Sequence, residues 1–230
     1  MFKKILVLAC TLVTTLAFAA CGEESADQTT TPAQNQPETA QIQKFDPPEQ
    51  FAGKKMLVAY YSRTGDNYQV GVIEKGNTAI VADMITAATG ADEIELKPVK
   101  EYPTDYKECT EVAKQEQADN ARPEVATKIE NFADYDVVFV GYPIWWSDLP
   151  MMMYTFLESY DWTGKTIIPF CTSAGNAMTG KEADIPNFAK GSIVIDDGLG
   201  IQGARCQADQ AGVQKDVELW LDKIGFMKKQ

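Results

Sequence analysis

Short apolar runs alternate with amphipathic stretches from residue 54 almost to the end of the chain. The segment from Met56 to Tyr61 is a continuous apolar run between polar residues, which is typical of a strand covered on both faces. Similar runs predict four more strands, at residues 94–96, 136–141, 166–171 and 192–195. Apolar residues at helical spacing predict helices at residues 78–89, 103–119, 151–159, 178–190 and 208–224. Strands that alternate with helices predict an α/β fold with a doubly wound, five-stranded parallel sheet and right-handed crossovers.

Two of the predicted helices end or begin at residues that commonly cap helices. Gly90 directly follows the first helix and suits the left-handed conformation of a C-terminal cap. Thr104 lies at the start of the polar helix that follows the second strand, and its hydroxyl is a suitable N-terminal cap. We therefore expect the first helix to end at Thr89 and the second to begin near Thr104.

The first fifty residues have a different pattern from the rest. Residues 1–20 combine two early lysines with an apolar run that ends in small residues, which is typical of a signal peptide. The surroundings of Cys21 resemble the bacterial lipobox, in which cleavage occurs before a lipid-modified cysteine, although ordinary signal peptidase cleavage near Ala19 is an alternative. Residues 21–50 are polar and nearly free of large apolar side chains, so we predict a disordered tether. These features predict an exported, membrane-anchored lipoprotein at the bacterial cell envelope, whose folded domain spans residues 51–230.

Composition narrows the chemistry of that domain. The chain has 21 Lys and Arg against 33 Asp and Glu, and a formal charge of −12 repels nucleic acid and anionic lipid surfaces. We therefore expect no nucleic-acid partner, and contact with the membrane only through the N-terminal lipid. The chain has no histidine, which excludes Ser-His-Asp catalysis, Cys-His catalysis and every His-ligated metal site. Cys109 and Cys206 are a candidate disulfide pair, whereas Cys171 at a strand end is predicted to be a buried apolar residue.

In a parallel α/β sheet, ligands bind beyond the carboxyl ends of the strands, so the segments after the strands are the first place to look for chemistry. The first strand is followed by Ser62, Arg63, Thr64 and Gly65, and the first helix begins near Asn77 and Thr78. Hydroxyls, a glycine and the N-terminus of a helix together favour an anion, and Arg63 adds a charged donor. Taken alone, this short motif is a weak signal, because in most proteins such a sequence is an ordinary turn between a strand and a helix that binds nothing.

The segments after the third and fourth strands differ from the first. The third is followed by an aromatic loop that contains Pro143, Ile144, Trp145 and Trp146. Adjacent indoles in a loop suit a flat ligand, although they can also pack on the domain itself or against a second subunit. The fourth strand is followed by a loop of small residues whose backbone a ligand can approach closely: Thr172, Ser173, Ala174 and Gly175.

Together these three segments resemble the phosphate loop and the two ring-binding loops of flavodoxin-like proteins, and the resemblance covers about residues 54–228. It is closest to a bacterial subgroup of that superfamily, some of whose members are exported. The resemblance implies the strand order 2-1-3-4-5 and FMN as the cofactor. It implies that Ser62, Arg63, Thr64, Gly65, Asn77 and Thr78 anchor the phosphate, and that residues 143–146 and 172–175 contact the ring. No catalytic side chain and no metal are implied.

One departure from the family pattern is an insertion in the phosphate loop. The family sequence Ser-x-Thr-Gly-Asn-Thr is split here, with residues 66–76 between Gly65 and Asn77. Residues 68–74 alternate in part and contain a glycine, so we expect a small hairpin or flap that returns Asn77 and Thr78 to the phosphate.

The resemblance leaves three classes of function open. The first is an FMN-binding protein that transfers electrons at the cell envelope to a redox partner protein or a small electron acceptor. The second is an FMN-dependent reductase of the NAD(P)H:quinone type. The third is a binding module that keeps the shape of a flavodoxin without redox turnover. The sequence does not predict the oligomeric state.

Overall fold

The computed structural model describes residues 44–175 and 177–230. The predicted signal peptide, Cys21 and most of the predicted tether lie outside the described residues. The end of the tether segment belongs to the domain, because Phe45 is fully buried in the core. Phe45 and Asp46 form the short strand β1, which pairs with β10 (Met227–Lys228) near the C-terminus.

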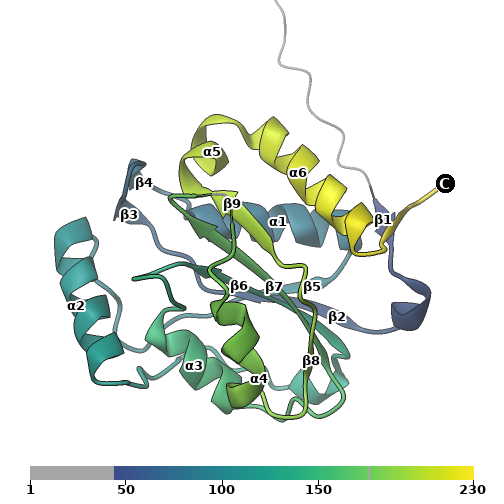
Figure 1. Cartoon of the computed structure of the whole chain (residues 1–230), viewed down its shortest axis with the longest axis horizontal. Coiled ribbons are helices and arrows are strands. Elements are labelled where there is room, and N and C mark those ends of the chain that lie inside the picture. Colours follow the sequence, from purple (N-terminus) through teal and green to yellow (C-terminus); the bar gives the residue numbers. More distant parts are fainter. Residues whose placement is uncertain (1–43, 176) are drawn as a thin grey trace, which may run out of the picture. The chain divides into compact units, whose positions relative to one another are not determined.

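A parallel sheet forms the centre of the domain (Figure 1). Its strands are β2 (Met56–Tyr60), β5 (Asp92–Glu95), β6 (Val137–Pro143), β7 (Thr166–Ser173), β8 (Ile193–Val194) and β9 (Leu199–Gln202). The order is β5-β2-β6-β7-β8, with β9 also paired to β7, and this confirms the predicted order 2-1-3-4-5. The predicted fifth strand, at residues 192–195, shortens to β8. The chain then leaves the sheet at Asp196 and Asp197 and pairs again with β7 from Leu199, as the strand β9, which the sequence did not predict.

Helices cover both faces of the sheet (Figure 1). One face packs against α1 (Asn77–Thr89), α5 (Gly203–Ala208) and α6 (Gln210–Lys223). The other packs against α2 (Tyr106–Ala118), α3 (Met151–Glu158) and α4 (Ile185–Phe188), with short 3-10 turns at Glu49–Phe51, Phe132–Asp134 and Lys181–Asp184. Side chains of the strands alternate between the two cores, so Val58 and Phe139 lie on the α1 side whereas Leu57 and Val138 lie on the α3 side.

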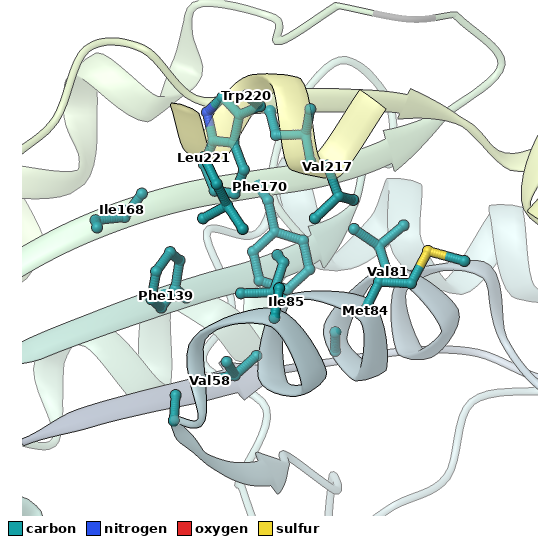
Figure 2. Packing of buried hydrophobic residues seen from close by; sticks show 14 of the residues in the cluster. Val58, Val81, Met84, Ile85, Phe139, Ile168, Phe170, Val217, Trp220 and Leu221 are labelled. Carbon is teal, nitrogen blue, oxygen red and sulfur yellow. The ribbon is translucent and has the colours of Figure 1, made fainter. Parts of the chain in front are cut away.

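Figure 2 shows the core on the α1 side, where side chains from three layers interlock. Val81 and Ile85 of α1 and Val217 of α6 enclose Phe170 from the sheet, and all four are fully buried. Burying a large apolar side chain contributes about 1.5–3 kcal/mol. This packing holds the first turn of α1 at the carboxyl edge of β2 and β7.

Most predicted elements are present, and the differences have local causes. The predicted C-terminal cap is confirmed, since Gly90 adopts a left-handed φ of 75°. The second helix begins later than predicted: Asp105, rather than Thr104, is its N-terminal cap and accepts the Glu108 N–H at 2.9 Å. The predicted helix at residues 178–190 shortens to Ile185–Phe188 with one preceding 3-10 turn, because Gly180 adopts a left-handed conformation.

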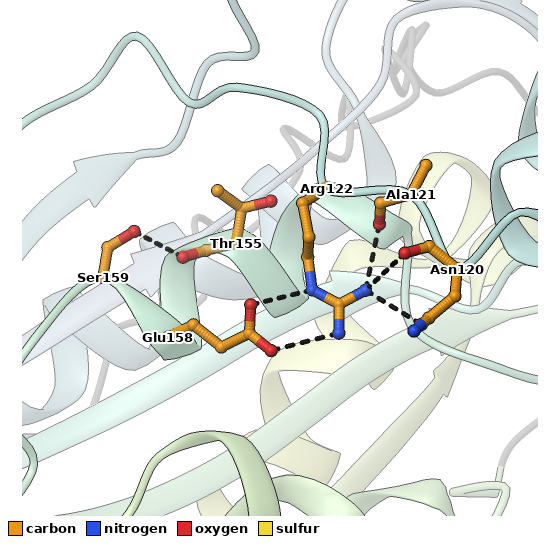
Figure 3. A network of polar contacts seen from close by, with 6 residues as sticks. All are labelled: Asn120, Ala121, Arg122, Thr155, Glu158 and Ser159. Carbon is orange, nitrogen blue, oxygen red and sulfur yellow. Dashed lines mark hydrogen bonds and ion pairs between the residues drawn. The ribbon is translucent and has the colours of Figure 1, made fainter.

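The segment after α2 is tied to α3 by an arginine. Both nitrogens of one edge of the Arg122 guanidinium donate to the Glu158 carboxylate, at 2.8 and 3.0 Å, in a bidentate pair (Figure 3). The remaining nitrogen donates to oxygens of Asn120 and Ala121 (Figure 3). This network fixes the chain that connects α2 to the next strand.

The candidate disulfide between Cys109 and Cys206 is wrong. Both thiols are free and buried, and they belong to cores on opposite faces of the sheet. Cys171 is fully buried as predicted, and burial raises the pKa of its thiol to about 12. Within residues 44–175 and 177–230, no helix combines the length and the hydropathy needed to cross a membrane.

Candidate cofactor-binding cleft

A cleft with a volume of about 360 Å³ opens at the carboxyl ends of β2, β6 and β7. Three groups of segments surround it: the α1 end (residues 62–65 and 76–78), the indole end (143–148 and 172–175) and the α2 end (67–70 and 106–113). The predicted site residues that line it are Arg63, Asn77, Pro143, Ile144, Trp145, Trp146, Thr172, Ser173, Ala174 and Gly175. The structure therefore brings residues from all three predicted loops to one cavity.

The insertion folds back as a small hairpin and returns the chain to residues 62 and 63, directly after β2. Its strands are β3 (Gly65–Asn67) and β4 (Gly71–Ile73), which pair in antiparallel register. At the return point, a Cβ atom on Gly76 would lie 2.1 Å from Ser62 Oγ and 2.7 Å from the Arg63 carbonyl oxygen. Only glycine fits there, and this close approach places the start of α1 directly against Ser62.

Side chains at the α1 end are engaged with the fold itself. Ser62 is buried, and its Oγ accepts the Ala79 N–H at 3.0 Å in the first turn of α1. The hydroxyls of Thr78 and Thr172 hydrogen-bond to each other at 2.8 Å. Four of the predicted phosphate-anchoring residues are not among the described residues that line the cleft: Ser62, Thr64, Gly65 and Thr78. The backbone N–H groups of Asn77 and Thr78 have no acceptor within the helix, because they belong to its first turn.

Arg63 lines the cleft, but its guanidinium donates its hydrogen bonds to backbone carbonyl oxygens. Its nitrogens donate to the carbonyl oxygens of Pro103, Thr104 and Asp105 at 2.7–3.1 Å, and also to that of Asp66. The side chain is only 8% exposed. Arg63 thus joins the hairpin to the segment that precedes α2, and its donors are already occupied.

The indole end is built around a tight turn. The backbones of Trp145 and Asp148 exchange two hydrogen bonds of 2.9 Å, and the central residues Trp146 and Ser147 have positive φ angles of 50° and 61°. Positive φ is unfavourable for residues with a Cβ, so surrounding contacts must hold this turn. The Asp148 carboxylate provides one such contact, since it accepts the Tyr154 hydroxyl at 2.6 Å.

The two adjacent tryptophans have different environments. Trp145 packs edge-on against Tyr61 and Tyr102, at centroid distances of 5.6 and 4.8 Å, and is half-buried. Trp146 is 50% exposed, and its indole N–H donates to the Thr110 carbonyl oxygen of α2 at 3.0 Å. Trp145 therefore packs against the core and supports the loop, whereas Trp146 lies at the mouth of the cleft and connects the indole end to α2.

The loop after β7 completes the indole end. Ser173 Oγ accepts the Gly175 N–H at 3.0 Å, which forms a local turn. The side chain of Asn77 lies close by, because a Cβ on Gly203 would come within 2.6 Å of Asn77 Nδ2. Gln207 of α5 donates to Asn77 Oδ1 at 2.8 Å and orients this side chain.

Sequence reasoning missed the α2 end completely. The residues that it contributes to the lining are Asn67, Tyr68, Val70, Tyr106, Cys109, Thr110 and Ala113, and three more come from near β7 and α5: Ala177, Thr179 and Gly203. The spacing of Tyr106, Cys109 and Ala113 places them on one helical face, and that spacing was the available signal. Burial raises the pKa of the Cys109 thiol, and nearby Arg63 partly opposes this shift.

Comparison with protein families shows which family this chain belongs to. A family model described as flavodoxin matches residues 55–222. The chain belongs to the flavodoxin family. A search of curated proteins gave no match.

Solved structures agree with the flavodoxin assignment. A candidate flavoprotein from Bacteroides eggerthii is 30% identical, with a TM-score of 0.57, and the match covers 74% of this chain and 98% of that chain. A candidate flavoprotein from Bacteroides uniformis is also 30% identical, with a TM-score of 0.56 and coverage of 72% and 98%. A flavoprotein from Lactobacillus acidophilus, solved in complex with FMN, is 22% identical with a TM-score of 0.48 and coverage of 68% and 97%, a similarity too weak to bear on the ligand of this flavodoxin.

Proposed function

We propose that this flavodoxin-family protein binds FMN in the cleft and transfers electrons at the bacterial cell envelope. The observation that carries the proposal is the meeting of a helix N-terminus, an exposed indole and a small-residue loop in one cavity. The helix N-terminus favours a phosphate, and the exposed indole favours a planar ring. Flavin, once bound, supplies the electron chemistry, and the protein supplies binding and electrostatics.

The donors at the α1 end support a mononucleotide. The N–H groups of Asn77 and Thr78 and the dipole of α1 favour a single phosphate without help from a cation. Arg63 is the only Lys or Arg among the described residues that line the cleft, and its donors are engaged with carbonyl oxygens. A second phosphate, as in FAD, therefore has no free cationic partner in the described lining.

The indole end supports a planar ring. Trp146 offers a half-exposed aromatic surface, and Ile144 and Pro143 add apolar surface beside it. On the other side, Ala174 and Gly175 are small and exposed, so a ring edge can approach the backbone there closely, although the Gly175 N–H is itself donated to Ser173 Oγ. These residues position a ring and exclude water from it.

Titration of the purified protein with FMN, riboflavin and FAD tests this proposal. We expect FMN to bind at least tenfold more tightly than riboflavin, because only FMN carries the phosphate, and more tightly than FAD. Equal affinities for FMN and riboflavin would show that the α1 end does not hold a phosphate. Absence of any flavin binding would overturn the proposed function.

Electron transfer follows from the cofactor, and the charge of the protein sets its direction. A chain with a formal charge of −12 disfavours further negative charge on a bound flavin. We expect the midpoint potential for the second electron to lie below that of free FMN, which suits a donor to a redox partner protein or a small acceptor. Spectroelectrochemical titration measures this potential, and a value above that of free FMN would contradict the electrostatic argument.

The envelope location is a proposal from the sequence. It rests on the signal-like residues 1–20 and on the lipobox-like surroundings of Cys21. Mass spectrometry of the N-terminal peptide from the native host tests it. We expect a diacylated Cys21, and a Cys21→Ser variant that leaves the membrane fraction. An unmodified N-terminus at another residue would exclude the lipid anchor.

A further inference from the structure

One side chain from α5 holds the returning end of the insertion beside the start of α1. Gln207 Nε2 donates to the Lys75 carbonyl oxygen at 3.0 Å and to Asn77 Oδ1 at 2.8 Å, across 130 residues of sequence. The two acceptors lie on either side of Gly76, where the chain makes its close approach to Ser62. Gln207 therefore fixes the chain at the point where the insertion ends and α1 begins.

The same two bonds determine which way the Asn77 amide faces. A backbone carbonyl oxygen only accepts hydrogen bonds, so the Gln207 atom that contacts Lys75 is the amide nitrogen. The Asn77 atom that contacts the same nitrogen must be an acceptor, and Nδ2 is then turned away from Gln207. Within residues 44–175 and 177–230, Asn77 Nδ2 has no hydrogen-bond acceptor.

Gly203, the first residue of α5, makes room for this nitrogen. A Cβ atom on Gly203 would lie 2.6 Å from Asn77 Nδ2 and 3.3 Å from Asn77 Cγ. The φ of Gly203 is not in the left-handed region, so space rather than backbone conformation requires glycine here. Asn77 and Gly203 both line the cleft, which places a free amide donor at its wall. By contrast, the side chains of Ser62, Arg63 and Thr78 already bond to the protein.

We propose that Gln207 and Gly203 are positioning residues for phosphate binding. They hold the Asn77 amide so that Nδ2 donates to the phosphate of FMN, in addition to the backbone N–H groups at the start of α1. This inference rests on the proposed function, because it needs the phosphate at the α1 end. It also explains how a phosphate loop interrupted by residues 66–76 keeps its last donors in place, since α5 holds the returning chain.

Titration of the Gln207→Met variant with FMN and riboflavin tests the role of the glutamine. Methionine keeps the length of the side chain and removes both donors without adding charge. We expect FMN to bind about fivefold more weakly and riboflavin to change less than about twofold, because hydrogen bonds to a charged group are the stronger ones. Gln210→Met is the matched control, because Gln210 is exposed and is not among the described lining residues. Its affinities for both flavins should equal those of the parent.

Gly203→Ala displaces the same amide by steric contact. The added Cβ meets the free end of the Asn77 side chain rather than backbone, so the amide can rotate away while the fold is kept. We expect FMN to bind about tenfold more weakly, with the urea midpoint of the parent and riboflavin affinity within about twofold. In an Asn77→Ala background, Gln207→Met and Gly203→Ala should weaken FMN no further, because the side chain through which they act is gone.

Three outcomes would overturn this inference while the proposed function stands. The first is a parent that prefers FMN to riboflavin and variants at positions 203 and 207 that bind both flavins as Gln210→Met does. The second is equal weakening of FMN and riboflavin, which would place the Asn77 amide on a part that both flavins share. The third is a further loss in the Asn77→Ala background, which would show that the two residues do not act through Asn77. A parent that does not bind FMN would remove the proposed function, and this inference with it.

Discussion

The α1 end and the indole end of the cleft use their side chains in opposite ways. At the α1 end, Ser62, Arg63 and Thr78 are buried and hydrogen-bonded to the protein, so backbone N–H groups remain for a ligand. At the indole end, Trp146 is half exposed and free to meet a ligand with its ring. Substitutions at the α1 end should therefore act first on stability, whereas those at the indole end should act first on affinity.

The largest expected effect is that of Arg63→Lys. A lysine carries three donors on one nitrogen and cannot reach all the carbonyl oxygens that the guanidinium now contacts. The acceptors belong to exposed or half-buried residues, so water replaces part of each lost hydrogen bond, and we expect a loss of about 1–3 kcal/mol in the free energy of unfolding. Urea denaturation measures it. If charge alone mattered at this position, Arg63→Lys would keep both the stability and the FMN affinity of the parent.

The opposite pattern, a loss of FMN affinity with little loss of stability, is expected for Trp146→Ala at the indole end. Loss of an aromatic contact costs about 1.4 kcal/mol of binding, or about tenfold in FMN affinity. Because Trp146 is half exposed, the free energy of unfolding should change by less than about 1 kcal/mol. Fluorescence titration and urea denaturation of the same samples check both halves. An unchanged FMN affinity would place the ring away from Trp146.

A smaller effect is expected for Ser147→Gly in the tight turn. Ser147 has a φ of 61°, which glycine adopts without steric cost. We expect the variant to be more stable than the parent by about 0.5–1 kcal/mol, with FMN affinity within twofold. Thermal unfolding with and without FMN measures this. A destabilised variant would mean that the Ser147 side chain itself holds the turn.

The smallest effect concerns the support behind the indole end. The Tyr102 hydroxyl, whose ring packs on Trp145, donates to Glu116 Oε2 at 2.8 Å. Burial raises the pKa of Glu116 above its ordinary 4.5, so its contribution to stability is full below pH 4.5 and is lost as the pH rises through the folded-state pKa.

Glu116→Gln removes this titration and keeps an acceptor for Tyr102. We expect the variant to be slightly more stable than the parent at pH 7, and the difference to disappear toward pH 4. Melting temperatures across this range measure it. A parent that is the more stable of the two at pH 7 would contradict the assigned direction.

Much of the fold follows from the sequence because its signals are local. Continuous apolar runs identified the central strands, and Gly90 identified the end of α1. Two strands that depend on distant partners were missed. No strand pattern surrounds Phe45, which becomes part of β1 by pairing with β10. The short strand β9 contains Gly200, which packs closely on the backbone of residue 177, so it lacks the continuous apolar run of the central strands.

The sequence predicted which loops meet at the cleft, but not how their individual side chains are used. The motif at Asn77 and Thr78 located the α1 end, since a helix N-terminus beside a strand end is visible in a sequence. The different environments of Trp145 and Trp146 could not be predicted. The two residues are identical and adjacent, and only the geometry of the turn buries one indole and exposes the other. The engagement of Arg63 depends on carbonyl oxygens some forty residues away, which no local pattern reveals.

A crystal structure of the protein with bound FMN tests the account most directly. The account predicts the phosphate on the backbone N–H groups of Asn77 and Thr78, the ring beside Trp146, and Arg63 still bonded to its carbonyl oxygens. A phosphate held by the Arg63 guanidinium, or a flavin bound outside the cleft, would contradict it.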